Sequence, residues 1–414
     1  MLAAGGIAGE TTVVTSSDST RRVPPAALYL ASPEDAEAGR LDVAGLPVAF
    51  RALMSALHAG CPFVAVPAVY RGTEVDRAIG RSARARAHTV WLDGDNSGAP
   101  HEPMVLLPAT VVVPPGALRA LLEVQPVAVL SASSPEAPVV LADATLVAAV
   151  EPQVAASLPA GDTLRRTLAA RRAAVVRGGW CLRATGPDTR KNAERRLYAD
   201  LGSVIDTRLD RLVHRPLSRH LTRVTVALGL SPNLISLANL ALGLLAVSLV
   251  AKATVANTLL GIVIYFASAV LDHVDGEVAR LTYAESRLGE WLDVTVDNVV
   301  HALIAVAMGI AAEQVAGAGR ALGVAMAIGF ALSALAAKMS GNGEDVPRAL
   351  TRLGNRNGFY VLLLAFLVLL ARAPAALPAL LLVAAVGAHV YWVGHLALRL
   401  RHQSGRSALF DDTL

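Results

Sequence analysis

The chain has 414 residues, of which 54% are hydrophobic and 17% charged, and its formal net charge is only +4. No tract of Lys and Arg with interleaved aromatic residues occurs, so the composition argues against nucleic-acid binding, and we expect no nucleic-acid partner. Two cysteines, Cys61 and Cys181, are too few for a disulfide framework, so we expect the half of the chain that holds them to lie in the cytosol.

Residues 1–25 are predicted to form a flexible leader. The stretch from Met1 to Gly9 is apolar but uncharged, and Thr/Ser-rich sequence follows it, which is not typical of a signal peptide. We therefore expect internal hydrophobic segments to direct insertion into the membrane.

Residues 26–195 alternate short strand-like and helix-like stretches. ALYLAS, FVAVPAV and MVLLPATVVV are typical of strands, whereas LPVAFRALMSALHAG is typical of a helix. This alternation predicts a cytosolic α/β domain with a mostly parallel sheet.

Residues 200–225 are predicted to form an amphipathic helix that lies in the membrane interface. Five arginines alternate there with leucine and valine: Arg208, Arg211, Arg215, Arg219 and Arg223. Such a helix would place its arginines near lipid phosphates and its leucines in the acyl boundary, and Pro216 would bend or divide it. A linker helix packed on the α/β domain is the alternative.

Residues 230–400 contain six apolar segments, each close to the roughly 20 residues that span a bilayer. They cover 232–251, 256–279, 288–312, 320–338, 357–372 and 375–398. Lys and Arg are concentrated in the loops on one side, which the positive-inside rule assigns to the cytoplasm. We therefore expect an integral protein of the inner or plasma membrane, with the α/β domain and a tail at 401–414 in the cytoplasm.

Four aspartates lie where the second and third segments meet. They are Asp272, Asp275, Asp293 and Asp297. Within each pair the spacing of three or four residues puts both carboxylates on one helical face, and a short turn lets the two faces meet. Carboxylates at membrane depth are costly unless they are paired, hydrated or bound to metal, and Mg²⁺ and Mn²⁺ prefer such oxygen ligands. The pattern predicts a site for two cations that bind a diphosphate. The alternative is that the four aspartates are ordinary charged residues at helix ends.

Eight fixed positions around these aspartates resemble the complete motif of the CDP-alcohol phosphotransferase (CDP-alcohol phosphatidyltransferase) family. The motif is Asp272-x2-Asp275-Gly276-x2-Ala279-Arg280-x8-Gly289-x3-Asp293-x3-Asp297. The resemblance covers about residues 200–400 and implies a membrane domain of six helices in a homodimer. It also implies transfer of a phospho-alcohol group, such as phosphatidyl, from a CDP-linked donor to a hydroxyl acceptor, with release of CMP. The resemblance does not select the acceptor, which could be inositol phosphate, glycerol phosphate or another polyol. The reaction would belong to the biosynthesis of phospholipids or polyol phosphodiesters.

The resemblance assigns roles to individual residues. Asp272, Asp275, Asp293 and Asp297 would bind two divalent cations, Mg²⁺ or Mn²⁺, and Asp293 and Asp297 would be catalytic, with Asp297 as the general base. The CDP-binding residues would be Gly276, Ala279, Arg280, Gly289 and Asn233. Arg280 as a cytoplasmic anchor and Asn233 as a helix cap are the alternatives.

His301 continues the face of Asp293 and Asp297, so it would either support the site or form a hydrogen bond between helices. The basic segment between the fourth and fifth spans would bind an anionic acceptor through Lys338, Arg352 and Arg356. Positive-inside anchoring explains these three residues equally well.

The α/β domain weakly resembles a sugar-phosphate nucleotidyltransferase. Arg40-Leu41-x3-Gly45-Leu46-Pro47 is similar to a substrate loop, and Leu106 to Thr110 is similar to a metal-binding strand. Acidic sequence at Glu34-Asp35 replaces the expected Gly-rich loop, however, and Leu46 and Thr110 replace the expected lysine and aspartate. We therefore expect a degenerate domain that makes no CDP-linked donor and serves docking, regulation or stability.

Two other functions are compatible with acidic residues in a membrane protein. One is a carboxylate-lined ion transporter, and the other is a non-catalytic scaffold. The clustering of the acids at one cytoplasmic mouth argues against the transporter, and the intact motif argues against the scaffold.

Overall fold

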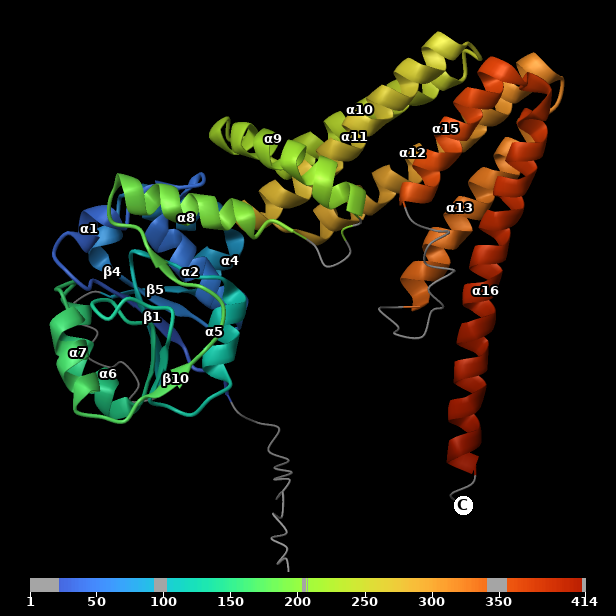
Figure 1. Ribbon diagram of the computed structural model, residues 1–414. Helices are drawn as coiled ribbons and strands as arrows, with labels where there is room; N and C mark the ends of the chain where they lie inside the picture. The colour runs from blue at the N-terminus through green and yellow to red at the C-terminus, as the bar shows by residue number, and fades with distance from the viewer. Residues whose placement is uncertain (1–21, 93–102, 203–205, 207, 341–355, 412–414) are drawn as a thin grey trace, which may run out of the picture. The chain divides into compact units, whose positions relative to one another are not determined.

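The computed structural model describes residues 22–92, 103–202, 206, 208–340 and 356–411. The chain divides into two compact units, Met1–Ala193 and Glu194–Leu414. The first combines helices with a β-sheet, and the second is entirely helical over its described residues (Figure 1).

A seven-stranded sheet forms the centre of the first unit, in the order β10-β8-β9-β6-β1-β4-β5. The strands are β1 (Ala26–Tyr29), β4 (Val64–Pro67), β5 (Thr89–Leu92), β6 (Met104–Pro108), β8 (Ala128–Leu130), β9 (Val140–Ala142) and β10 (Ala174–Val176). All neighbours pair in parallel except β9, which runs antiparallel to β6 and β8. The predicted α/β class with a mostly parallel sheet is confirmed.

Helices cover both faces of this sheet (Figure 1). On one face α6 (Ala144–Ala155) and α7 (Gly161–Ala169) pack against alternate residues of the central strands, including Ala27, Tyr29 and Leu106. On the other face lie α2 (Val48–Ala59) and α5 (Pro115–Leu122). Strands covered on both sides are apolar throughout, which explains the uninterrupted hydrophobic runs of β1 and β6.

Short elements surround the central sheet. They are α1 (Asp35–Ala38), α3 (Glu74–Arg81), α4 (Ala83–His88), the 3-10 turn η1 (Ala68–Tyr70), the hairpin β2 (Asp42–Val43) with β3 (Leu46–Pro47), and the pair β7 (Val111–Val112) with β11 (Leu182–Arg183). The β2–β3 turn places Ala44 and Gly45 at φ of 52° and 86°, as a two-residue hairpin requires. Gly45 and Leu46, which resemble a substrate loop in the sequence, thus belong to this hairpin.

The second unit is a bundle of long helices that follows α8 (Pro187–Ala199). Its elements are the π-helical turn η2 (Asp210–His214), α9 (Arg215–Ala227), α10 (Pro232–Val250), α11 (Val255–Thr282), α12 (Arg287–Ala316), α13 (Arg320–Ser340), α15 (Arg356–Arg372), the 3-10 turn η3 (Pro374–Ala376) and α16 (Leu377–Asp411).

Four segments are long and apolar enough to cross a membrane: Pro232–Val250, Val255–Thr282, Arg287–Ala316 and Pro374–Ala397. Together they support an integral membrane protein. The predicted fourth and fifth spans coincide with the apolar helices Arg320–Ala336 and Asn357–Arg372, whose described lengths are shorter. The prediction of six spans is therefore not confirmed.

Side-chain caps fix where the first three long helices begin. Ser231, Thr254 and Ser286 each accept a hydrogen bond from a backbone N–H in the first turn of α10, α11 and α12. Tyr283, at φ 53°, ends α11 in the left-handed region. Only a few residues therefore connect α11 to α12, and α10 packs against both helices.

Small residues bring the helices close together. A Cβ added at Gly243 of α10 would lie 2.4 Å from a methyl group of Val300 on α12. A Cβ added at Gly309 of α12 would lie 2.8 Å from Cα of Gly323 on α13. Such contacts replace the hydrophobic effect as the cause of helix association inside a bilayer.

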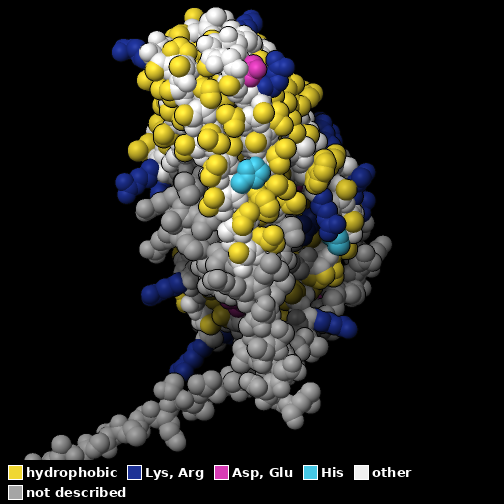
Figure 2. Space-filling model, turned by 90° about the vertical axis from the view of Figure 1, so that its right-hand side faces the viewer, with side chains coloured by type: hydrophobic (Ala, Val, Ile, Leu, Met, Phe, Trp, Pro, Cys, Tyr) yellow, Lys and Arg dark blue, Asp and Glu magenta, His cyan; other side chains and the backbone are white. Residues whose placement is uncertain are grey.

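Large apolar side chains cover the outside of α15 and α16. The exposed fraction is 52–70% for Val361, Leu364, Val368, Leu382, Val383, Val386 and Val390. Figure 2 shows this hydrophobic surface on one side of the molecule, with Lys and Arg at its margins. An apolar surface of this extent is typical of contact with lipid.

Candidate active site

The four aspartates occupy the neighbouring ends of α11 and α12. Asp272 and Asp275 lie in the last turns of α11, and Asp293 and Asp297 lie in the first turns of α12. Asp293 is in hydrogen-bond contact with Asp272, and its carboxyl group also interacts electrostatically with Asp275 and Asp297. The structure thus brings together all four predicted residues from two separate helices.

Asp275 is held by α10 as well as by its own helix. Its side chain is buried, and Ser236 Oγ of α10 donates a hydrogen bond to Oδ2 at 2.6 Å. The backbone N–H of Gly276 donates to Oδ1, also at 2.6 Å. Both carboxylate oxygens are therefore oriented before any ligand binds, and the first span becomes part of the site.

A cavity of about 10 Å³ lies beside Asp272 and Asp297, which both line it. Its other lining residues are Asn239, Tyr265, Ser268, Ala269, Val296 and Val300. This volume is close to the space that one water molecule occupies. The inner end of the site is therefore closed by α10, α11 and α12.

His301 connects Asp297 to α11. Its Nδ1 lies 2.6 Å from the carbonyl oxygen of Asp297 and 3.4 Å from the carboxylate Oδ1 of the same residue. Its Nε2 lies 2.7 Å from Tyr265 Oη, which fits a proton on Nδ1 and a hydroxyl that donates to Nε2. His301 is therefore an interhelical hydrogen bonder that also touches the aspartate site.

The small residues of the motif leave room at the same end of the helices. A Cβ at Gly276 would lie 3.4 Å from Arg280 Nη1, so the exposed arginine folds back over the glycine. A Cβ at Gly289 would lie 3.4 Å from Asn233 Oδ1, so Asn233 also reaches this region. The cap of α10 is Ser231, whose side chain accepts from Leu234 N, and Asn233 is left exposed beside Gly289.

Comparison with protein families supports the chemistry suggested by this geometry. Residues 229–393 match the family model for CDP-alcohol phosphatidyltransferase. This match lies within the helical unit and supports membership of that family. A search of curated proteins finds no match to the chain. The match supports a role as a transferase of phosphate-containing groups in phospholipid biosynthesis.

The predicted acceptor residues are not placed by the structure. Arg352 lies outside the described residues, and Lys338 and Arg356 stand at helix ends where side chains are not described. That these three residues bind an anionic acceptor therefore stays a prediction, which rests on their positive charge.

The sequence analysis did not find the partners of Glu277, which lies between two motif positions. Its carboxylate is fully buried and accepts hydrogen bonds from Arg215 at 2.7 Å, Ser218 at 2.8 Å and Thr222 at 2.7 Å. The expectation that Arg215 faces lipid phosphates is wrong, because its guanidinium is only 5% exposed and also binds Asp206. A buried carboxylate needs such a charged partner, and α9 supplies it.

The segment predicted to lie in the membrane interface has exposed apolar residues elsewhere. Leu212 is 77% exposed, and Leu217 and Leu221 are 47% and 38% exposed, on an element whose arginines, apart from Arg215, lie partly or fully in solvent. This exposure fits a helix whose leucines enter the acyl boundary.

In the first unit, an ion pair occupies the carboxyl ends of β1 and β6. Strand order reverses between these two strands, which is where open α/β sheets usually bind ligands. Asp35 is fully buried there and pairs with Arg183, which also donates to Thr110 Oγ1 at 3.2 Å. Asp35 Oδ2 accepts from the backbone N–H of Ala31 at 2.8 Å. The ion pair thus lies at the edge of the sheet where ligands usually bind in folds of this kind.

Proposed function

We propose that the protein is an integral membrane CDP-alcohol phosphotransferase that moves a phospho-alcohol group, such as phosphatidyl, from a CDP-linked donor to a hydroxyl acceptor and releases CMP. The observation that carries the proposal is the convergence of four aspartates from α11 and α12 within the matched domain. A transporter needs acidic groups along a path, whereas these groups share one end of two helices.

The donor set fits divalent cations. Four carboxylates in a membrane domain repel one another, and oxygen ligands of this kind suit Mg²⁺ or Mn²⁺. Asp272, Asp275, Asp293 and Asp297 would hold two such ions. When bound, the ions would offset the negative charge of the donor diphosphate and of the phosphate that is transferred.

Asp297 is the best-placed general base. Its side chain is 42% exposed, so an acceptor hydroxyl can reach it, and His301 lies beside it. The acceptor oxygen would bond to the phosphorus that carries the donor alcohol as the bond from that phosphorus to the CMP oxygen breaks. The hydroxyl proton would pass to the Asp297 carboxylate.

The CDP moiety would lie over Gly276 and Ala279, with Arg280 near its phosphates and Asn233 and Gly289 at its edge. The family resemblance implies a homodimer. The concentration of Lys and Arg in the loops on one side favours a cytoplasmic position for the site. Lys338, Arg352 and Arg356 would attract an anionic polyol phosphate as acceptor.

The first unit is proposed to make no CDP-linked donor. The Asp35–Arg183 ion pair supports this, because it fills the end of β1 with an acidic group that would repel a triphosphate. Its role would be docking, regulation or stability.

A substrate screen tests the proposal. The full chain, reconstituted with Mg²⁺ or Mn²⁺, is given CDP-diacylglycerol or soluble CDP-polyols in combination with inositol phosphate, glycerol phosphate or free polyols. We expect CMP release with one combination, and loss of it in Asp293→Asn and Asp297→Asn. Glu290→Gln, an exposed carboxylate on the same helix outside the motif, is the matched control. CMP release that survives both aspartate changes would overturn the assignment.

A further inference from the structure

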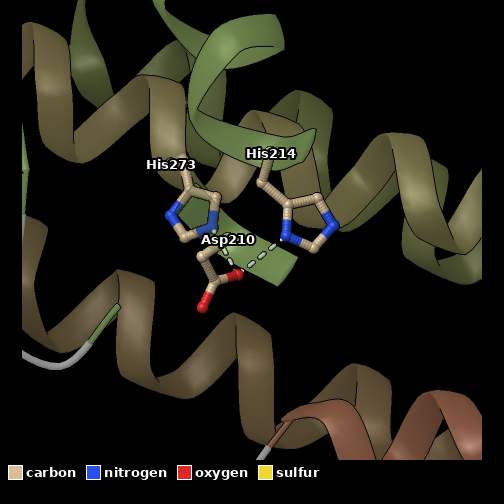
Figure 3. Close-up of side chains that lie close together, drawn as sticks. All are labelled: Asp210, His214 and His273. Atoms are coloured by element: carbon tan, nitrogen blue, oxygen red, sulfur yellow. Dashed lines mark hydrogen bonds and ion pairs between the residues drawn. The ribbon is translucent and has the colours of Figure 1, made fainter. Parts of the chain in front are cut away.

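A second group of ligand-bearing side chains lies apart from the four aspartates. Asp210 and His214 come from the π-helical turn η2, and His273 comes from α11. Their ligand atoms all lie within 4.8 Å of one another. Figure 3 shows both imidazole rings directed at one carboxylate oxygen of Asp210.

The group is enclosed by the protein. His214 is fully buried, Asp210 is 6% exposed, and the side chain of His273 is 12% exposed. The π-helical turn brings Asp210 and His214, four residues apart, to one side of the chain. Single π-turns of this kind are rare in proteins and are found frequently at functional sites.

The two histidines lie at different distances from the same carboxylate oxygen. His214 Nδ1 lies 2.7 Å from Asp210 Oδ1, a hydrogen-bond length. His273 Nε2 lies 3.4 Å from the same oxygen, beyond the usual range for N–H···O. Ligand atoms about 2.0–2.1 Å from a tetrahedral zinc ion stand about 3.3 Å from one another. Because the three ligand atoms lie within 4.8 Å of one another, shifts of about 1.5 Å or less would bring them around a single ion.

The surroundings of His214 also suit a metal ligand. Metal-binding histidines usually hydrogen bond through the ring nitrogen that does not face the ion. His214 Nε2 lies 3.2 Å from Tyr360 Oη of α15; in the tautomer that donates a hydrogen bond to this hydroxyl, Nδ1 carries no proton and can bind an ion between it and Asp210. The ring of Phe266 packs 4.7 Å from the His214 ring and excludes water from this side.

We propose that Asp210, His214 and His273 form a mononuclear site for a transition metal, with Zn²⁺ as the preferred ion. Two imidazole nitrogens and one carboxylate oxygen are a zinc donor set, whereas Mg²⁺ takes oxygen ligands. Three protein ligands leave a fourth position for water. The ion links η2 to α11 next to Asp272, and the proposal does not depend on the phosphotransferase assignment.

Metal analysis of the full chain tests this site. The protein is purified without a histidine tag, stripped with chelator, incubated with Zn²⁺ in a large excess of Mg²⁺, and separated from free metal. We expect about one zinc ion per chain in the native protein. His214→Gln and His273→Gln should each lose it, and His220→Gln, an exposed histidine on α9, should keep it.

Two further measurements keep the result interpretable. Co²⁺ bound to the native protein should show the intense visible absorption of a tetrahedral site, a readout that needs no variant to fold. Asp297→Asn should retain the zinc, which separates this site from the aspartates. Native protein that binds no zinc, or zinc that persists in both His214→Gln and His273→Gln, would show that the cluster is hydrogen-bonded only and would overturn the proposal.

Discussion

The guanidinium of Arg215 and the carboxylate of Glu277 lie 2.7 Å apart inside the helical unit, with exposed fractions of 5% and 0%. Glu277 belongs to the same helix as Asp272 and Asp275, whereas Arg215 begins α9. Burial disfavours the charge of Arg215, but hydrogen bonds to Asp206 and Glu277 outweigh it and raise the pKa of Arg215. The ion pair therefore fixes α9 against the helix that carries half of the aspartate site.

Replacing Glu277 tests this link. Among the described residues, Glu277→Ala leaves the buried Arg215 with Asp206 as its charged partner, and breaking a buried pair costs about 3–5 kcal/mol. We expect a clearly lower thermal unfolding midpoint in detergent, and a smaller decrease for Glu277→Gln, which keeps hydrogen bonds to Ser218 and Thr222. Glu290→Gln, on the surface of α12, should leave the midpoint unchanged. An unchanged midpoint in Glu277→Ala would show that the pair does not stabilise the bundle.

The parts of this molecule that local spacing determines could be predicted from the sequence. The parallel strands appear as apolar runs, and the aspartates repeat at helical spacing on two segments joined by a short turn. Even so, the described lengths of α13 and α15 leave two of the six predicted spans unconfirmed.

Contacts between distant residues could not be predicted in the same way. Arg215 is one of five arginines at similar spacing, and nothing local distinguishes it from those that face solvent. Its partner Glu277 lies 62 residues away. Asp210 and His273 are 63 residues apart, and the π-helical turn that presents Asp210 has no sequence pattern of its own.

Ser236 is expected to tune the affinity of the aspartate site for cations. Its hydroxyl orients Asp275 Oδ2 from α10 at 2.6 Å, and a hydrogen bond to a charged group is worth about 1.5–3 kcal/mol. We expect Ser236→Ala to raise the Mg²⁺ concentration for half-maximal CMP release by about tenfold or more. Ser248→Ala is the matched control, because Ser248 is exposed on the same helix and bonds only locally to Leu245 O at 2.8 Å. Equal Mg²⁺ dependence in the two variants would contradict the positioning role.

Removing divalent metal should stop the reaction without unfolding the protein. Without cations the four carboxylates repel one another and the donor diphosphate has no counter-charge. EDTA should abolish CMP release, and excess Mg²⁺ or Mn²⁺ should restore it. The thermal midpoint should decrease, because cations that bind only the folded protein stabilise it, but the protein should stay folded, since Asp275 keeps its bonds to Ser236 and Gly276. CMP release that persists at full rate in EDTA would contradict the proposed cation site.

The two thiols of the first unit should be unreactive in the folded protein. Burial raises the pKa of Cys61 and of Cys181 to about 12, so almost no thiolate is present near pH 8. Because the folded pKa values lie above those of the unfolded chain, the thiols cost no stability below about pH 8.5, and stability decreases as the pH rises from there toward 12. Ellman's reagent at pH 8 should label both cysteines in denaturant and neither in the native protein. Rapid labelling of native protein would show that the unit opens.

The Asp35–Arg183 pair should stabilise the first unit and take no part in nucleotide chemistry. Arg183→Ala leaves a fully buried carboxylate with only backbone and Ser32 partners, a loss of about 3–5 kcal/mol. In the full chain, Trp91 and Trp180 of this unit should report unfolding at lower temperature by fluorescence. Arg77→Ala is the control, because the Arg77–Glu74 pair is exposed and contributes little to stability.

The native chain should release no pyrophosphate from CTP with any sugar or polyol phosphate. Pyrophosphate release that Arg183→Ala abolishes would instead make Arg183 a phosphate-binding residue and the first unit an active nucleotidyltransferase.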